Sequence, residues 1–183
     1  MILAAGASFA APVFATDFDV TVTNLTRGSY FTPVLLAAHS VDTTVFSAGA
    51  AASTGLQEMA EGGSIATLSA DLATAGATIV ENPAAGLLGP AQSTTVAINT
   101  DDAVDNTQLT VVAMILPTND GFIGLNSIDI PTQPGTYQFN VSAYDAGTEG
   151  NDEIRGGGAP NTPGFPAPGP IDTSSGMNGT GVP

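Results

Sequence analysis

The 183-residue sequence is long enough for one domain with a sizeable core, and its 43% hydrophobic content is typical of a folded protein. Seventeen acidic residues accompany only two Lys or Arg residues, which gives a formal net charge of −15. This balance excludes electrostatic binding to nucleic acids and to anionic lipid surfaces, because both depend on Lys and Arg. The absence of cysteine excludes disulfides and thiolate metal sites.

The N-terminus is an apolar run of small residues that ends in Val13-Phe14-Ala15. Such a run is typical of the hydrophobic region and cleavage site of a secretory signal peptide, although no positive charge precedes it here. A buried N-terminal strand is the alternative. We predict that residues 1–15 are a signal peptide and that the protein is secreted or displayed at the cell surface. No other run approaches the ~20 apolar residues of a membrane span.

Two strands are predicted next. Residues 18–25 alternate apolar and polar side chains, which indicates a strand with one buried face. Residues 26–33 contain Gly28 and Pro33 and indicate a turn. Residues 33–40 form a continuous apolar run, which favours a strand that is covered on both faces.

The periodicity then becomes helical over residues 50–76. Thr54 and Gln57 have the spacing of a capping box at the start of a short helix, which a pair of glycines would end. Ser64 would cap a second short helix that stops at Gly76.

Strand patterns resume after this helical insertion, separated by turn-forming residues. The segments are residues 77–82, 93–100, 107–118, 121–130 and 135–144. About seven or eight short strands favour an antiparallel β-sandwich, whereas a parallel α/β fold would need a helix between most strands. We therefore predict an all-β sandwich domain over residues 16–155 with a short helical insertion, followed by an irregular Gly/Pro-rich tail over residues 156–183.

One ten-residue stretch, residues 144–153, is crowded with carboxylates. Hard cations such as calcium take six to eight oxygen ligands, and Gly147 would let the chain turn sharply between Asp145 and Glu149. The spacing is not that of an EF-hand, and a solvated acidic loop is the alternative. The four carboxylates are those of Asp145, Glu149, Asp152 and Glu153.

A second loop strengthens the case for a cation. Asp120 follows the longest apolar strand, and Asp145 also stands at a strand end. If the two strands run in the same direction, Asp120, Asp145 and Glu149 lie on one rim of the sandwich. Three carboxylates brought together would repel one another, and bound calcium removes that cost. We predict one calcium ion held by these three residues.

The segments VTVTNLTRGSYFTP, LPTNDGFIGL and AYDAGTEGNDE together resemble the spondin-type domain of F-spondin, of mindin and of many secreted bacterial proteins. The resemblance covers the chain from about Phe18 to Gly158. It implies a calcium-binding β-sandwich similar to a C2 domain, used in extracellular adhesion in animals. The calcium ligands of the family would correspond to Asp120 in TND and to Asp145 and Glu149 in DAGTE.

The sequence also departs from the family pattern. Gly121 stands where an aromatic residue often follows the first ligand, and Glu149 stands where the animal domains carry aspartate. The cysteines of the animal domains are absent. These differences bear on calcium affinity and weaken the expectation of an animal-type partner.

No catalytic motif stands out. His39 is the single histidine, and without cysteine it cannot build an ordinary zinc site, so we predict a hydrogen-bonded structural histidine. No G-x-S-x-G motif is present, and the lack of tryptophan disfavours carbohydrate processing. We predict that the protein is not an enzyme.

These observations favour a secreted, non-catalytic calcium-binding module for extracellular adhesion or association with a surface or matrix. Its partners would be calcium and an extracellular protein or a second copy. The alternative is a structural subunit of an extracellular filament or surface layer. In that case the apolar N-terminus or the Gly/Pro-rich tail would add a strand to a neighbouring sandwich.

Overall fold

The computed structural model describes residues 17–149. The predicted signal peptide (residues 1–15) and the predicted tail (residues 156–183) lie outside the described residues. The elements, in chain order, are β1 (Asp17–Thr23), β2 (Tyr30–Phe31), β3 (Leu35–His39), α1 (Thr54–Gly62), α2 (Ala66–Thr74), β4 (Thr78–Glu81), β5 (Ser93–Asn99), β6 (Gln108–Leu116), β7 (Gly121–Asp129) and β8 (Ser142–Asp145).

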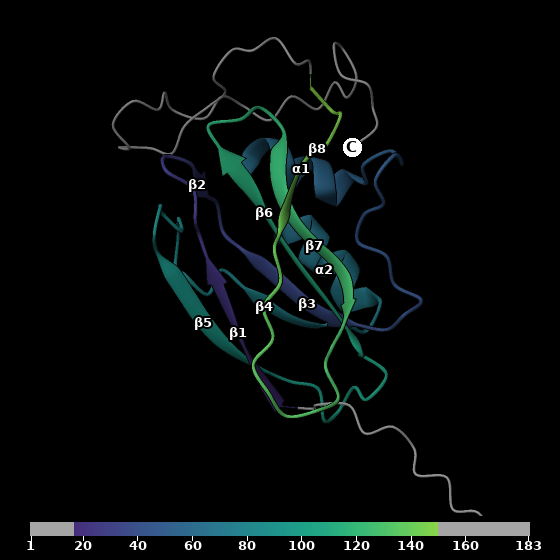
Figure 1. Ribbon diagram of the computed structural model, residues 1–183. Helices are drawn as coiled ribbons and strands as arrows, with labels where there is room; N and C mark the ends of the chain where they lie inside the picture. Colours follow the sequence, from purple (N-terminus) through teal and green to yellow (C-terminus); the bar gives the residue numbers. More distant parts are fainter. Residues whose placement is uncertain (1–16, 150–183) are drawn as a thin grey trace, which may run out of the picture.

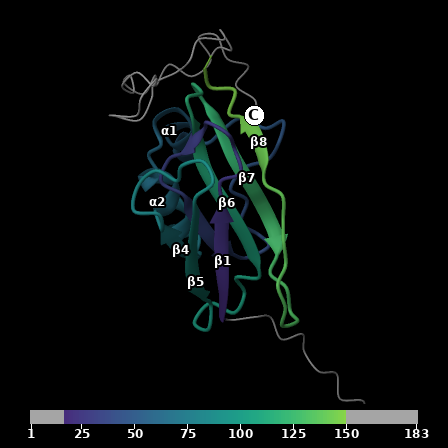
Figure 2. The ribbon, with the colours of Figure 1, turned by 60° about the vertical axis from the view of Figure 1, so that its left-hand side comes forward.

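The strands form two stacked antiparallel sheets (Figure 1). The large sheet has the order β4-β3-β6-β7-β8, with β2 paired to β6, and the small sheet is the β1–β5 pair. The small sheet covers one face of the large sheet, while α1 and α2 cover the other face (Figure 2). The predicted all-β antiparallel sandwich with a short helical insertion is confirmed.

Each face of the large sheet has its own apolar core. On the helical side, Leu56 and Met59 of α1 pack with Leu35 and Phe122 from the sheet. On the other side, Val22 of β1 and Ile98 of β5 pack against Val111 and neighbouring residues of the large sheet. Side chains of a central strand alternate between these two cores, which is why β3 and β6 are apolar almost throughout.

The patterns of the first two strands are confirmed. In β1, Phe18, Val20 and Val22 turn toward the core, while the intervening polar residues are exposed. In β3 all five residues are buried, because the strand lies between β4 and β6 and has a core on each face.

The predicted helix caps are wrong by small shifts. Ser53, not Thr54, caps α1, and its hydroxyl accepts a hydrogen bond from the Leu56 amide at 3.2 Å. The residue three positions after Ser53 is Leu56, which cannot complete a capping box, and the side chain of Gln57 donates to Glu61. Ser64 does not cap α2, because the N-cap is Ile65 and makes no side-chain hydrogen bond; the Ser64 N–H instead bonds the Glu58 carbonyl at the end of α1 at 3.2 Å.

Two other strand predictions need correction. The predicted turn over residues 26–33 includes the short strand β2, which pairs with the end of β6. The predicted strand over residues 135–144 pairs only from Ser142, and residues 136–141 have no strand partner among the described residues. This unpaired segment is taken up below.

Candidate functional site

The candidate site lies where β6 turns into β7. Pro117 follows β6, and the hydroxyl of Thr118 donates to the Ile115 carbonyl and accepts a hydrogen bond from the Gly121 amide at 3.0 Å. A Cβ on Gly121 would lie 2.6 Å from the Thr118 hydroxyl, so a side chain does not fit at this position without displacing it. The turn therefore fixes the position of Asp120, which it contains.

Asp120 is buried, with 1% of its surface exposed. Its Oδ2 accepts hydrogen bonds from the backbone amides of Thr148 at 2.8 Å and Glu149 at 3.0 Å. The Thr148 hydroxyl lies 3.3 Å from the same oxygen. Because hydrogen bonds to a charged acceptor are stronger than those between neutral groups, this carboxylate anchors the loop that follows β8.

The loop after β8 is shaped by its own first residue. Asp145 pairs with Gly121 across the sheet, and its Oδ1 accepts a hydrogen bond from the Gly147 amide at 2.7 Å. Gly147 has φ of +69°, the left-handed conformation that favours glycine. The Ala146 amide donates to the Asp120 carbonyl at 3.1 Å. The two loops thus form one rim of the sandwich, called the loop rim below: residues 118–121 and 145–149.

The structure brings all three predicted ligands to the loop rim. Asp120 hydrogen-bonds the backbone of Glu149, and Asp145 pairs with the residue next to Asp120. Within residues 17–149, however, no three acidic or histidine side chains gather into a group that could hold a metal ion. Metal binding by these three residues stays a prediction, and it requires the side chains of Asp145 and Glu149 to turn toward Asp120.

The chemistry of the donors fits calcium. All three side chains offer carboxylate oxygens, which hard cations prefer. Among the described residues, Asp120 accepts hydrogen bonds through Oδ2 and Asp145 through Oδ1, so the second oxygen of each carboxylate accepts none there. These second oxygens, together with the Glu149 carboxylate, would hold the ion.

An aromatic cluster forms the base of the loop rim. Phe122 and Tyr144 are paired across β7 and β8, with ring centroids 5.4 Å apart. Phe46 meets both rings edge-on, at centroid distances of 5.2 Å and 4.9 Å. Gly124 allows this approach, since a Cβ there would lie 2.5 Å from the Phe46 ring. The loops above the cluster therefore start from a firmly packed end of the sheet.

The sequence did not single out Thr118 or Thr148 as site residues. Thr118 carries a usable signal, because a Thr next to Pro and Asn commonly bonds nearby backbone in a turn. The donors of Thr148 and Glu149 are backbone amides, which every residue except proline possesses. Only the fold shows that these amides point at Asp120.

His39 has the structural role predicted for it. Its side chain is fully buried, with Nδ1 2.9 Å from the Ser40 carbonyl and Nε2 2.8 Å from the Thr110 hydroxyl. Since a carbonyl oxygen only accepts, Nδ1 carries a proton and donates to Ser40, while Nε2 is hydrogen-bonded to the Thr110 hydroxyl. Both ring nitrogens are therefore hydrogen-bonded, and the bond through Nε2 links β3 to β6.

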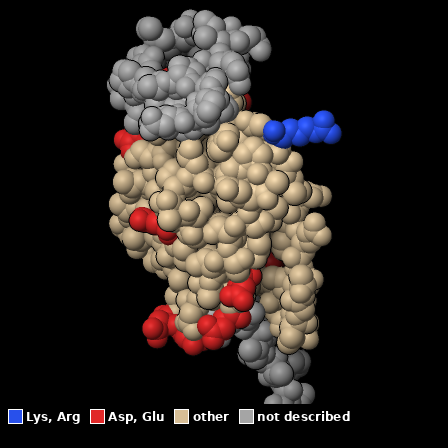
Figure 3. All heavy atoms as spheres, turned by 90° about the vertical axis from the view of Figure 1, so that its left-hand side faces the viewer, with Lys and Arg blue, Asp and Glu red and all other residues tan. Residues whose placement is uncertain are grey.

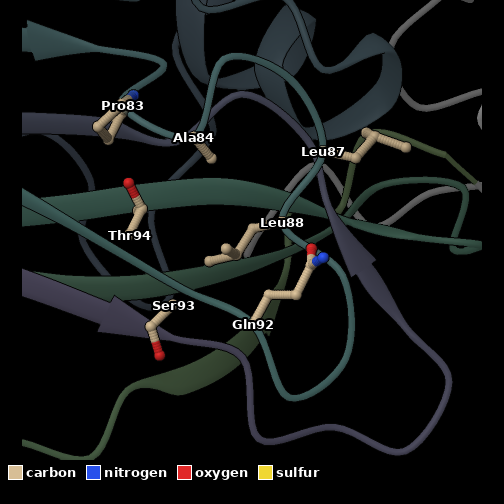
Figure 4. A pocket seen from close by; sticks show the side chains of 7 residues that line it. All are labelled: Pro83, Ala84, Leu87, Leu88, Gln92, Ser93 and Thr94. Carbon is tan, nitrogen blue, oxygen red and sulfur yellow. The ribbon is translucent and has the colours of Figure 1, made fainter.

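An open hollow of about 390 Å³ lies between the loop after β4 and the start of β5 (Figure 4). Its lining residues are Pro83, Ala84, Leu87, Leu88, Gln92, Ser93 and Thr94. None of these described residues is ionisable, and the hydroxyl of Ser93 is hydrogen-bonded to that of Thr23 at 2.8 Å. The hollow thus offers no acid–base pair or activated nucleophile for catalysis.

A second group of carboxylates lies at the opposite end of the sandwich, where Figure 3 shows acidic atoms gathered at the lower end. Asn99 pairs with Asp17 across the small sheet, and its side-chain amide donates to Asp17 at 2.7 Å and to Asp101 at 3.0 Å. All three residues are exposed. We call them the acidic end.

Comparison with known protein families identifies the family of this chain. The family model described as Spondin_N, the spondin N-terminal domain, matches residues 5–164. The chain belongs to the spondin N-terminal domain family. This family is typically extracellular and is not known for enzymatic activity. No curated protein matches the chain.

Two further findings bear on this spondin domain. None of the helices within residues 17–149 is long and apolar enough to cross a membrane. The Gly121 amide donates to the Thr118 hydroxyl at 3.0 Å, and the neighbouring Phe122 supplies the buried ring beneath the loop rim.

Proposed function

We propose that this spondin domain is a secreted, non-catalytic module that binds one calcium ion at the loop rim for extracellular adhesion or surface association. The observation that supports the proposal best is the buried carboxylate of Asp120, which accepts hydrogen bonds from the backbone amides of Thr148 and Glu149. This arrangement brings two acidic loops to one place and fixes their backbones before any ion binds.

The ion would act on the side chains rather than on the fold. Asp145 and Glu149 carry like charges near the charge of Asp120, so their carboxylates gain nothing by converging without a cation. Calcium would draw them together and reduce the motion of residues 145–149. Because loops at the end of a sandwich commonly carry function, a rigid rim would present a defined surface to a partner.

The direct test is a calorimetric calcium titration of the parent and of the double variant Asp145→Asn, Glu149→Gln. These changes keep the shapes of the side chains and remove two charges, while Asp120 still anchors the loop. We expect one ion per chain in the parent, with a dissociation constant of roughly 10⁻⁴–10⁻³ M as in extracellular modules, and at least roughly tenfold weaker binding in the variant.

The matched control is Asp17→Asn, Asp101→Asn, which removes the same charge from the acidic end. This control should bind calcium like the parent, because its two residues are exposed and lie at the acidic end, opposite the loop rim. Equal affinity of all three proteins would remove the site assignment, since the bound ion would then not depend on Asp145 and Glu149.

The filament hypothesis remains a prediction. The two segments proposed to add a strand to a neighbour, the N-terminus and the Gly/Pro-rich tail, lie outside the described residues. Nothing in residues 17–149 favours these segments as donors, so we retain calcium binding as the proposed function.

A further inference from the structure

Most of the chain between β7 and β8 is open to solvent. All residues from 132 to 143 are exposed. Strand β8 pairs with β7 only between Ser142–Asp145 and Gly121–Gly124, so the rest of β7 has a strand partner on its β6 side alone among the described residues. Figures 1 and 2 show the chain turning at the lower end of the molecule after β7 and running back up to β8. We call residues 136–141 the open segment.

A distortion in β7 lies just beyond the point where its pairing with β8 stops. Ser127 has φ of +49°, and the register of β6 against β7 shifts between Leu109 and Val111. The Ser127 amide donates to the Thr110 hydroxyl at 2.9 Å, and this hydroxyl also bonds His39. A bulge bends its strand, and this bulge lies three residues beyond Gly124, the last residue of β7 that pairs with β8.

The open segment nevertheless has the pattern of a strand. Tyr137, Phe139 and Val141 alternate with polar residues and remain 49%, 45% and 41% exposed. Aromatic and β-branched residues at a spacing of two are typical of a half-buried strand face. A single exposed apolar residue needs no explanation, whereas three on one face of an ordered, unpaired segment suggest a missing neighbour.

The open segment also lacks the usual protection of a sheet edge. Natural edge strands carry charged residues that prevent pairing with other chains. Between Asp129 and Asp145 this chain has no charged residue, although its net charge is −15. Pro131 and Pro134 stand before the open segment and leave residues 136–141 free of proline.

We propose that the open segments of two copies of this chain pair antiparallel about a two-fold axis at Phe139. In this register Tyr137 opposes Val141 of the second copy, and Phe139 opposes itself. No other antiparallel register places each of the three exposed apolar residues opposite another of the three. Aromatic and β-branched side chains pair favourably across antiparallel strands.

The distribution of charge near the open segment is compatible with pairing between two copies of the chain. The nearest carboxylate, Asp145, would oppose Gln133, so within residues 133–145 no two acidic residues would face each other across the pair. As whole molecules, however, two copies with a net charge of −15 each repel one another. Salt reduces this repulsion, because the Debye length falls from about 10 Å at 0.1 M to about 3 Å at 1 M ionic strength. Association should therefore strengthen as salt is added.

Sedimentation of the full chain in EDTA, over a range of protein and salt concentrations, tests the proposal independently of calcium. We expect a monomer–dimer equilibrium that shifts toward dimer at high salt. Phe139→Asp places two carboxylates face to face and removes an apolar contact, so its dimer should dissociate at least roughly tenfold more readily. The control Leu25→Asp adds the same charge at a residue 81% exposed and should behave like the parent.

Cross-linking checks the register. The chain has no cysteine, so Phe139→Cys introduces a single thiol that should form a disulfide-linked dimer on mild oxidation, whereas Leu25→Cys should not. Circular dichroism confirms that each variant folds. A parent that is monomeric at every salt concentration, or a dimer equally sensitive to both aspartate substitutions, would overturn the proposal.

Discussion

Both ends of the sandwich carry clustered carboxylates, but only one end organises them. At the loop rim, Asp120 is buried and holds two backbone amides. At the acidic end, Asp17 and Asp101 are exposed and connected through the side chain of Asn99. Acidic composition alone therefore does not mark a site, and the distinguishing feature is a carboxylate that the backbone itself positions.

The largest difference between the two ends should appear on removing one carboxylate. Asp120→Ala leaves the amides of Thr148 and Glu149 without their acceptor and should lower the free energy of unfolding by about 2–4 kcal/mol. Asp101→Ala removes an exposed side chain and should change it by about 0.5 kcal/mol or less. Urea unfolding measures both, and equal losses would contradict the assigned roles.

The next effect concerns the aromatic base of the loop rim. Gly124→Ala places a methyl group 2.5 Å from the Phe46 ring and 3.1 Å from Tyr144, which should cost about 1–3 kcal/mol through overpacking. Gly28→Ala is the matched control, since nothing lies within 4 Å of a Cβ there. Thermal melts of the two variants would sharpen the contrast, and equally stable variants would show that the base is loosely packed.

Calcium should stabilise the protein through the loop rim alone. At about 10 mM calcium, a dissociation constant of roughly 10⁻⁴–10⁻³ M corresponds to about 1.4–2.7 kcal/mol of stabilisation, or roughly 3–10 °C in Tm. Magnesium should stabilise less, because it demands a stricter octahedral geometry. Melting curves should show this gain in the parent and in Asp17→Asn, Asp101→Asn. A gain that persists in Asp145→Asn, Glu149→Gln would contradict the account.

The smallest expected effect belongs to the acidic end. Exposed like charges repel weakly and are screened, so raising sodium chloride from about 0.1 M to about 1 M should stabilise the parent modestly. Asp17→Asn, Asp101→Asn should reduce this salt-dependent gain by a few tenths of a kcal/mol. Urea unfolding at the two salt concentrations measures it, and an unchanged salt response would show that these carboxylates do not repel appreciably.

Local patterns were sufficient for much of the fold. The alternation in β1, the continuous apolar run of β3 and the left-handed glycine at Gly147 follow from side-chain periodicity and backbone sterics. The joining of Asp120 to the loop of Asp145 was also inferred, because both residues stand at strand ends. The cap predicted at Thr54 was misjudged because the neighbouring Ser53 also offers a hydroxyl, and the cap predicted at Ser64 was wrong because the N-cap of α2 is Ile65, which makes no side-chain hydrogen bond.

The remaining features depend on contacts between distant residues. The open segment has the sequence pattern of a strand, and nothing in that pattern indicates the bulge at Ser127, whose amide bonds Thr110 of another strand. The donors to Asp120 are backbone amides, which leave no mark in the sequence. In both cases tertiary packing, rather than residue type, determines which backbone group makes the hydrogen bond.

The most direct test of the calcium site is anomalous X-ray diffraction from crystals of the full chain grown with calcium. We predict one anomalous peak at the loop rim, at about 2.3–2.6 Å from carboxylate oxygens of Asp120, Asp145 and Glu149. A saturated crystal without a peak there, or with its calcium at Asp17 and Asp101 instead, would contradict the account.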